Sequence, residues 1–343
     1  MAGAHIRPPR PLLPPMQPLR PLAWRRPRPR RAGGRAARSG PSATPTLFRL
    51  SSLQVATLHH APLPPTPDPR VTATVGDLAT GTGLRAALEA AGRAGGGLRA
   101  VVNCAAVSSP AACEADPAGA TAINVPTQLI DAMAAGSGGE ASPPPLFVQL
   151  STDQVYPSSR RGAPPGRSLW TEDDAPAPCN AYGRSKLAAE AELAARWPRS
   201  VSLRCSAMVG PMPRHPVAGT RFLQFVDAAI DGRVEATFWT DEWRSFVSVA
   251  DVATAVAACV AASTLLPSII NVGGPEPLSR HAFALRVAAA RGAEAGRVRG
   301  AARGANPPPT PTPADIGMDV ARLRRVLGVE PRAVEAIAGG TKS

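Results

Sequence analysis

The length and composition of the chain suit a folded protein of one large or two modest domains, because 343 residues, 44% of them hydrophobic, can bury a sizeable core. The formal net charge is +13, but residues 1–67 hold eleven arginines, no lysine and no acid, which leaves +2 for the rest. Because the basic charge lies in this leader, whose arginines are not interleaved with aromatic residues, the composition excludes nucleic acid as a partner of the folded part.

The leader itself, residues 1–46, is dominated by Pro, Arg, Ala and Gly and contains too few large apolar residues to fold, so we predict disorder there. An acid-free, arginine-rich start resembles an organelle transit peptide, which would place the protein in a plastid or mitochondrion. The alternatives are a non-native first exon or a plain disordered tail, and the cytosol is then expected. An intact Met1 on the mature protein would contradict the transit peptide.

The first half of the remaining chain alternates short apolar runs with helical patterns. Strands are expected at 54–58, 71–75, 100–104, 146–150 and 201–205, and helices at 84–91, 120–135 and 182–196. The run at 146–150 is continuously apolar, as in a strand that is covered on both faces. Asn180 is suited to cap the helix at 182–196. This alternation predicts an α/β fold with a doubly wound parallel sheet.

In the second half the regular alternation of strands and helices ends. This change indicates that residues of the C-terminal half form a smaller domain. Helices are expected at 222–230, 249–262, 278–291 and 320–327, with a strand at 268–272. The weakly polar stretch at 253–270 contains Ser263, Thr264 and Pro267, so we interpret it as a buried helix feeding a strand and expect no membrane span. Five scattered cysteines without a Cys-x-x-Cys pair indicate a reducing compartment and offer no disulfide framework or zinc site.

Three side chains in the first half suggest a hydride-transfer site. Tyr182 and Lys186 are four residues apart on one helix, so both project from the same face. A nearby ammonium favours the phenolate, so we expect Lys186 to lower the pKa of Tyr182 and suit it as a general acid. Thr152 follows the strand at 146–150, where its hydroxyl could hydrogen-bond a substrate carbonyl. Tyr-x-x-x-Lys and Ser-Thr-Asp are each common alone, but their order here strengthens the prediction.

The chain resembles an extended short-chain dehydrogenase/reductase, and specifically the dTDP-4-dehydrorhamnose reductase family, which includes the regulatory beta subunit of methionine adenosyltransferase. The resemblance covers roughly residues 50–335. The matching segments are Val102-Asn-Cys-Ala-Ala106, Ser151-Thr-Asp-Gln-Val-Tyr156, Trp170-Thr-Glu-Asp-Asp174, Tyr182-Gly-Arg-Ser-Lys-Leu187, Leu203-Arg-Cys-Ser206, Asp241-Glu-Trp-Arg-Ser-Phe-Val247, Asn271-Val-Gly-Gly-Pro275 and Pro313-Ala-Asp-Ile-Gly-Met-Asp319.

The resemblance implies roles for these residues and a division of the chain. Tyr182 would be the acid, Lys186 would also hold the nicotinamide ribose, and Thr152 would polarise the carbonyl. The implied cofactor-binding residues are Asp77, Leu78, Cys104, Ala105, Ala106, Ser151, Tyr182 and Lys186. After the leader, residues 47–206 would form an N-terminally incomplete Rossmann-like NAD(P)-binding domain, and 207–335 the substrate-binding region.

One departure from the family concerns the cofactor's pyrophosphate. The family begins with a central strand and Gly-x-x-Gly-x-x-Gly, whose backbone amides hold the pyrophosphate. No such sequence precedes the strand at 54–58; Gly33-Gly34 lies among arginines, and Gly81-Thr-Gly83 follows the wrong strand. We therefore expect weak cofactor binding by this chain, because several charge-assisted phosphate contacts are lost. Alternatively, the gene model is wrong and the native protein carries the loop.

Further residues bear on specificity. His59-His60 follow the strand at 54–58, where no acid is present to bind a ribose hydroxyl, which favours NADP over NAD, although a solvated pair is an equal alternative. Adjacent histidines on a strand point to opposite faces, so no metal site is predicted. Asp153 and Arg244 are the candidate substrate residues. Arg244 could hold the diphosphate of a nucleotide-sugar, or it could pair with a neighbouring acid, Asp241 or Glu242.

Two functions remain open at this point. The first is NADPH-dependent reduction of a 4-keto-6-deoxy nucleotide-sugar, with NAD as the other cofactor; a chain without the glycine loop could be inactive. The second is a non-catalytic regulatory subunit that binds a methionine adenosyltransferase catalytic subunit. The absent loop and the local likeness of Asn271–Ser279 and Pro313–Asp319 to that branch favour the second. Both share one fold, so the fold does not choose between them.

Overall fold

The computed structural model describes residues 55–59, 70–94, 97–136, 143–159, 163–164, 166, 169–211, 221–304 and 309–339. The predicted leader at 1–46, with Gly33-Gly34, lies outside these residues, as do His60 and the side chain of His59. The strands expected at 54–58 and 71–75 are present as β1 (Val55–His59) and β2 (Val71–Val75). They pair in parallel and form a two-stranded sheet.

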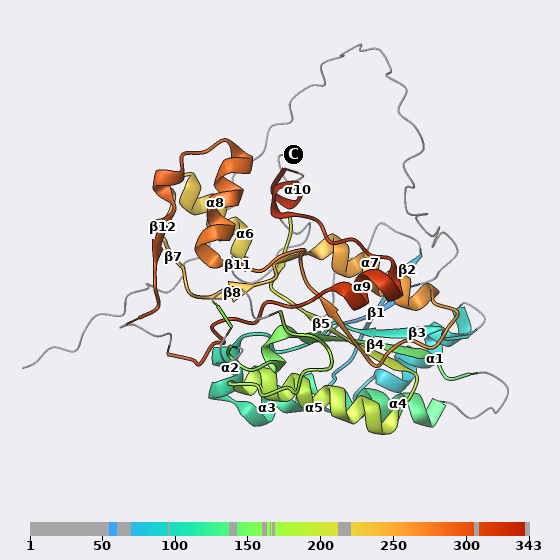
Figure 1. Cartoon of the computed structure of the whole chain (residues 1–343). Helices are drawn as coiled ribbons and strands as arrows, with labels where there is room; N and C mark the ends of the chain where they lie inside the picture. Colours follow the sequence, from blue (N-terminus) through green and yellow to red (C-terminus); the bar gives the residue numbers. More distant parts are fainter. Residues whose placement is uncertain are drawn as a thin grey trace, which may run out of the picture.

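A four-stranded parallel sheet is the centre of the fold, and its strands lie in the order β10–β5–β4–β3. Figure 1 labels three of them, β3, β4 and β5, between the helices. The strands are β3 (Ala100–Asn103), β4 (Leu146–Thr152), β5 (Ser200–Cys205) and β10 (Ile269–Val272). In their register, Val148 of β4 lies opposite Val102 of β3 and Val201 of β5. The α/β class and parallel sheet predicted from the sequence are therefore confirmed.

Helices cover both faces of this sheet, as the continuously apolar β4 requires. Phe147 and Val148 are both fully buried, on opposite faces, because successive residues of a strand alternate in direction. Phe147 packs in a cluster with the first helical layer and Val148 in a cluster with the second. The first layer is α1 (Leu84–Ala94), α4 (Thr127–Gly136) and α5 (Ala181–Arg196), and the second is α7 (Val249–Ala261) and α9 (Ala321–Leu327).

Another hydrophobic cluster lies beyond the sheet and is built on phenylalanine rings. The rings of Phe246 and Phe283 have centroids 4.2 Å apart, and Phe222 stacks on Phe246 at 5.4 Å. The elements around it are α6 (Phe222–Ile230), β7 (Thr237–Trp239), α8 (Arg280–Arg291), β12 (Arg299–Ala301) and α10 (Val334–Gly339). The predicted domain boundaries stay a prediction. The elements α7, β10 and α9 come after residue 207 in the sequence. In space they nevertheless belong to the main sheet and to the helical layer that covers it.

The helix predicted at 120–135 is wrong as a single element. The chain forms α3 (Pro117–Asn124) and then α4, with Val125 in an extended conformation at φ −91 and ψ 116. The ring of Pro126 disfavours a helical conformation of the preceding residue, and the helix breaks there. The sequence analysis also did not predict the short elements, because they are too short to show a periodic pattern. They are β7, β12 and α10 of the preceding cluster together with α2 (Pro110–Ala115), β6 (Met208–Val209), β8 (Trp243–Arg244), β9 (Val247–Ser248) and β11 (Leu278–Ser279).

The weakly polar stretch at 253–270 behaves as expected, since it forms most of α7 and runs into β10. None of the helices in the described ranges is long and apolar enough to cross a membrane.

The edge of β3 that faces away from β4 has no partner among the described strands. Val102 on this strand is 38% exposed, which is unusual for a valine in a parallel sheet. Of the described strands in the first half of the chain, β1 and β2 therefore form one parallel sheet, while β3, β4 and β5 form another together with β10. This is the arrangement expected when the strand that normally joins them is not among the described residues.

Candidate active site

The Ser-Thr-Asp motif lies at the carboxyl end of β4, where the chain turns into a short 3₁₀ helix, η1 (Asp153–Val155). Thr152 is buried, and its hydroxyl accepts a hydrogen bond from the Gln154 amide at 3.2 Å. The same hydroxyl donates to Asp153 Oδ1 at 3.2 Å. Open α/β sheets bind ligands at the carboxyl ends of their strands, so Thr152 lies where the fold expects a ligand.

Helix α5 brings Tyr182 and Lys186 to this end of the sheet. The helix begins after Asn180, whose Oδ1 accepts a hydrogen bond from the Gly183 amide at 2.8 Å, as predicted for a cap. Tyr182 is in the first turn, and Lys186 follows one turn later. Thr152 is close enough to the Tyr182 phenol to lower its pKa through a hydrogen bond. The three predicted catalytic residues therefore come together.

Gly183 allows this close approach. A Cβ on Gly183 would lie 2.3 Å from the carbonyl oxygen of Gln154 and 2.8 Å from the Cβ of Pro178. Neither distance is compatible with a side chain, and the first obstacle is backbone that cannot rotate away. The glycine between Tyr182 and Lys186 thus lets the start of α5 pack directly on η1, next to Thr152.

Replacing Gly183 by alanine is therefore expected to force α5 away from η1 and to lower the free energy of unfolding by about 1–3 kcal/mol, the usual cost of overpacking. Urea denaturation would measure the loss. The matched control is Gly92→Ala in α1, where an added Cβ meets nothing within 4 Å. That variant should gain about 0.5–1 kcal/mol from its higher helix propensity. Equal stabilities for the two variants would contradict the packing argument.

The structure does not support the prediction that Lys186 lowers the pKa of Tyr182. Burial raises the pKa of Tyr182, the Thr152 hydrogen bond opposes this, and the Asp153 carboxylate adds to the rise. Desolvation penalises the phenolate more than its neighbours stabilise it, so the phenol stays protonated at neutral pH. The prediction of a lowered pKa is wrong for the protein without ligands, although a protonated phenol remains suited to donate a proton.

Lys186 is 2% exposed, and its ammonium has no hydrogen-bond acceptor within the part of the chain that the structure describes. Burial lowers its pKa from 10.5 to about 8. The ammonium nitrogen is not among the fully buried atoms of the described residues that lack a partner, so it keeps contact with solvent at the end of a buried side chain. Such an ammonium is ready to bind hydroxyl oxygens of a ligand.

The composition of the chain singles out the same two side chains. Of its 38 lysines and arginines, only Lys186 and Lys342 are lysines, and Tyr156 and Tyr182 are its only tyrosines. Lysine differs from arginine in being a compact cation whose pKa shifts readily on burial, which suits the buried position of Lys186. Rarity of this kind is a sequence signal that Tyr-x-x-x-Lys alone does not provide.

Asp153 and Arg244, the predicted substrate residues, are both buried near this site. Asp153 Oδ2 accepts a hydrogen bond from Ser206 Oγ at 2.7 Å, and burial raises the pKa of the carboxyl despite the charge of Arg244. Arg244 Nη2 lies 3.1 Å from Glu242 Oε1, with both side chains almost inaccessible, and donates to the Pro313 carbonyl at 2.9 Å. The pairing with Glu242, one of the two open alternatives, is therefore present.

The predicted cofactor residues lie at the carboxyl ends of three strands. Cys104 follows β3 and is close enough to Lys186 for their charges to interact. Ser151 of β4 donates to Glu190 Oε1 at 2.5 Å. Asp77-Leu78 forms a turn after β2, in which Asp77 Oδ1 accepts from the Ala79 amide at 2.8 Å.

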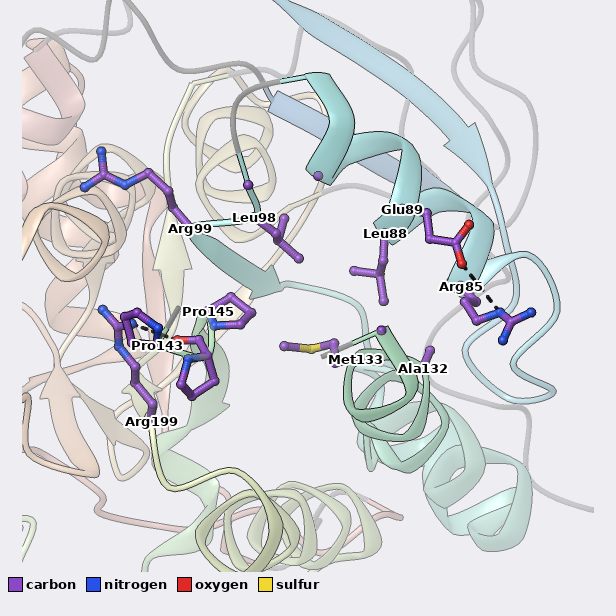
Figure 2. A pocket seen from close by; sticks show the side chains of 14 residues that line it. Arg85, Leu88, Glu89, Leu98, Arg99, Ala132, Met133, Pro143, Pro145 and Arg199 are labelled. Atoms are coloured by element: carbon purple, nitrogen blue, oxygen red, sulfur yellow. Dashed lines mark hydrogen bonds and ion pairs between the residues drawn. The ribbon is translucent and has the colours of Figure 1, made fainter. Parts of the chain in front are cut away.

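A cavity of about 630 Å³ lies elsewhere, between α1, α4 and the approach to β3 (Figure 2). Figure 2 shows Leu88, Leu98 and Met133 pointing toward one another across it. Arg99 and Arg199 also line it and directly precede β3 and β5, so the cavity opens at the amino ends of the strands. It is therefore separate from the site formed by Thr152, Tyr182 and Lys186.

The chain is similar in sequence to a known protein family. Residues 73–338 match the RmlD substrate binding domain. The dTDP-4-dehydrorhamnose reductase of Mycolicibacterium smegmatis is 30% identical over 217 residues, which are 62% of this chain and 61% of that protein. The enzyme of the same name from Mycobacterium tuberculosis is 30% identical over 212 residues, 62% of this chain and 65% of that protein. The chain thus spans less than two thirds of the length of these relatives.

Solved structures share the fold at lower identity. MoeE5 in complex with UDP-glucuronic acid and NAD has a TM-score of 0.65 at 22% identity, covering 85% of this chain and 90% of that one. A dTDP-4-dehydrorhamnose reductase from Bacillus anthracis in complex with NADP has a TM-score of 0.62 at 19% identity, covering 78% and 88%. The chain belongs to the RmlD substrate binding domain family, the dTDP-4-dehydrorhamnose reductase-like branch of the extended short-chain dehydrogenases/reductases.

Proposed function

We propose that this chain reduces the 4-keto group of a 6-deoxy nucleotide-sugar with a nicotinamide cofactor, with a preference for NADPH. The observation that carries the proposal is the buried Lys186 side chain, whose ammonium has no acceptor among the described residues, one helical turn after Tyr182, which interacts with Thr152. Relatives 30% identical are named dTDP-4-dehydrorhamnose reductase, and a structural neighbour contains NADP. The absence of an acid at His59-His60 favours NADPH.

The described residues fit one end of such a cofactor. The three N–H donors of Lys186 suit the two hydroxyls of a nicotinamide ribose. The pyrophosphate finds no cradle in the glycines at 81–83, because the amides of this loop bond within the loop. The Gly81 amide donates to the Asp77 carbonyl at 2.8 Å, and the Asp77 amide donates to the Thr82 carbonyl at 2.9 Å. Cofactor binding is therefore expected to be weak.

The chemistry of the chain's own residues follows from their environment. The cofactor, when bound, supplies the hydride. The Tyr182 phenol, which burial keeps protonated, donates its proton to the carbonyl oxygen as that oxygen gains negative charge. The Thr152 hydroxyl has one proton, which it donates to Asp153 Oδ1 in the structure, and on substrate binding this proton turns to the same carbonyl oxygen. The Lys186 ammonium stabilises the phenolate that remains on Tyr182.

The roles of Asp153 and Arg244 in holding the nucleotide-sugar stay predictions. Arg244 is already bound to Glu242, so a diphosphate would have to share this cation with a buried carboxylate. Glu242 Oε2 is the buried side-chain atom without a hydrogen-bond partner in the described residues, which leaves this cluster incompletely satisfied. Neither the site nor the named relatives favour a regulatory subunit of methionine adenosyltransferase, and that alternative also stays a prediction.

The test is the oxidation of NADPH, followed by absorbance, with a panel of 4-keto-6-deoxy nucleotide-sugars. We expect turnover that depends on the sugar, a KM for NADPH well above the micromolar range, and slower turnover with NADH. The control is the Lys186→Met variant, which should lose turnover and lower the affinity for NADPH further. Failure of the unchanged chain to oxidise saturating NADPH with any sugar of the panel would contradict the proposed function.

A further inference from the structure

A buried carboxylate on α5 ties the candidate site to the sheet. Glu190 lies four residues after Lys186 on the same face of the helix and is 7% exposed. Ser151, directly before Thr152, donates to Glu190 Oε1 at 2.5 Å. Arg204 of β5 donates from Nη2 to Glu190 Oε2 at 2.7 Å and from Nε to Oε1 at 3.1 Å. Glu190 therefore fixes α5 to both β4 and β5.

The same network continues across the sheet. Arg204 Nη1 donates to the Tyr156 hydroxyl at 3.0 Å, and this hydroxyl donates to Asn271 Oδ1 of β10 at 2.7 Å. Asn271 Nδ2 donates in turn to the Trp170 carbonyl at 2.9 Å, and the Trp170 ring stacks on Tyr156 at 5.6 Å. A buried network with every member satisfied makes its surroundings rigid. The position of α5 is thus set by contacts that reach β10.

Glu190 also acts on the charge of Lys186. Three groups favour the ammonium form against its burial: Cys205 of β5, Glu190 of α5 and Cys104 after β3. Burial raises the pKa of the Cys205 thiol to about 12, so this group is neutral at pH 7, and Cys104 is an exposed thiol. Glu190 is the carboxylic side chain among these three groups, it is paired with Arg204 at 2.7 Å, and it lies one helical turn from Lys186.

We propose that Glu190 is a positioning residue: it fixes the height and rotation of α5, which carries Tyr182 and Lys186, and it keeps the Lys186 side chain charged. The link to catalysis rests on the proposed reductase function, but the charge of Lys186 does not. A salt bridge with a purely structural role would hold the helix in place and leave the titration of Lys186 unchanged, which separates the two roles experimentally.

The experiment is an NMR titration of the full chain grown with ¹³Cε-lysine. Because the chain has two lysines, two signals are expected, and Lys186→Arg assigns them. Glu190→Gln keeps the size of the side chain and one acceptor for Ser151 but removes its charge. We expect the Lys186 midpoint to fall by about one pH unit or more, a tenfold or larger loss of proton affinity, as for other buried opposite charges.

The matched control is Glu192→Gln on the same helix, whose carboxylate accepts from Arg196 Nη1 at 2.8 Å and should leave the Lys186 midpoint unchanged. Glu190→Asp keeps the charge and should retain most of the effect. If Glu190→Gln does not fold, Glu190→Gln/Arg204→Met removes both buried charges and is titrated in the same way. A Lys186 midpoint equal to that of Glu192→Gln would overturn the proposal.

Turnover supplies the second measurement. Glu190→Gln should lower kcat at pH 7 by tenfold or more, with little change in the KM for the sugar, and shift the alkaline limb of the pH profile downward. An unchanged kcat and pH profile would overturn the catalytic part of the proposal. Failure of the unchanged chain to turn over any sugar would contradict the proposed function, whereas the NMR titration would still decide the role of Glu190.

Discussion

Replacing Tyr182 by phenylalanine is expected to lower reductase turnover by about 100-fold to 10,000-fold, because the variant has no proton to give to the developing alkoxide. Tyr182 is only partly buried, and the Thr152 hydroxyl is close enough to interact with its phenol. Removing one hydroxyl should therefore cost about 1 kcal/mol of stability or less. Steady-state NADPH oxidation with the best sugar of the panel measures the change, and thermal unfolding checks the fold.

The pH dependence of the unchanged enzyme gives the control for this variant. Burial lowers the pKa of Lys186 to about 8, so the ammonium is present below this pH and lost above it. The turnover should be constant below pH 8 and fall as the pH rises through that value. The raised pKa of Tyr182 places its own ionisation at higher pH. A Tyr182→Phe enzyme that retains the full rate would exclude this phenol as the acid.

Most of the fold was predictable because the apolar periodicity of a parallel sheet covered on both faces is strong. The strand at 71–75 matches β2 in both bounds, and Asn180 caps α5 as expected. The break at Pro126 was also visible in the sequence, and weighting proline more heavily than composition would have found it. Two-residue strands such as β8 have no periodicity to detect, since they depend on tertiary contacts.

The site was predictable in its members but not in its electrostatics. The spacing of Tyr182 and Lys186 was enough to place both on one face of a helix. It does not show how deeply the two groups are buried, and burial is the largest influence on both pKa values. The ion pair of Glu190 and Arg204 was not predicted because the two residues lie 14 positions apart on different elements. Only the packing of α5 on β5 brings them together. One signal was available: Glu190 continues the spacing of Tyr182 and Lys186 by another four residues on an otherwise alanine-rich helix.

Replacing Arg204 by methionine is expected to lower the free energy of unfolding by about 3–5 kcal/mol, since it leaves the Glu190 carboxylate buried without its partner. The two side chains are 2% and 6% exposed, so water cannot take the place of the guanidinium. The matched control is Arg196→Met on the surface of α5. Arg196 pairs with Asp131 and, at 2.8 Å, with Glu192, but these side chains are wholly or partly exposed and water screens their charges, so the loss of Arg196 should cost much less stability than the loss of Arg204.

The double variant Arg204→Met/Glu190→Gln then separates the cost of an unpaired charge from the value of the pair. Removing both charges should recover most of the stability lost by Arg204→Met, because a buried ion pair returns little more than its desolvation cost. Chemical denaturation of the three variants measures these differences. Recovered stability together with a lowered Lys186 titration midpoint would mean that the buried pair is kept for the charge of Lys186 and not for the fold. Equal losses for Arg204→Met and Arg196→Met would instead show that water reaches Glu190, and the buried network could then no longer set the charge of the site.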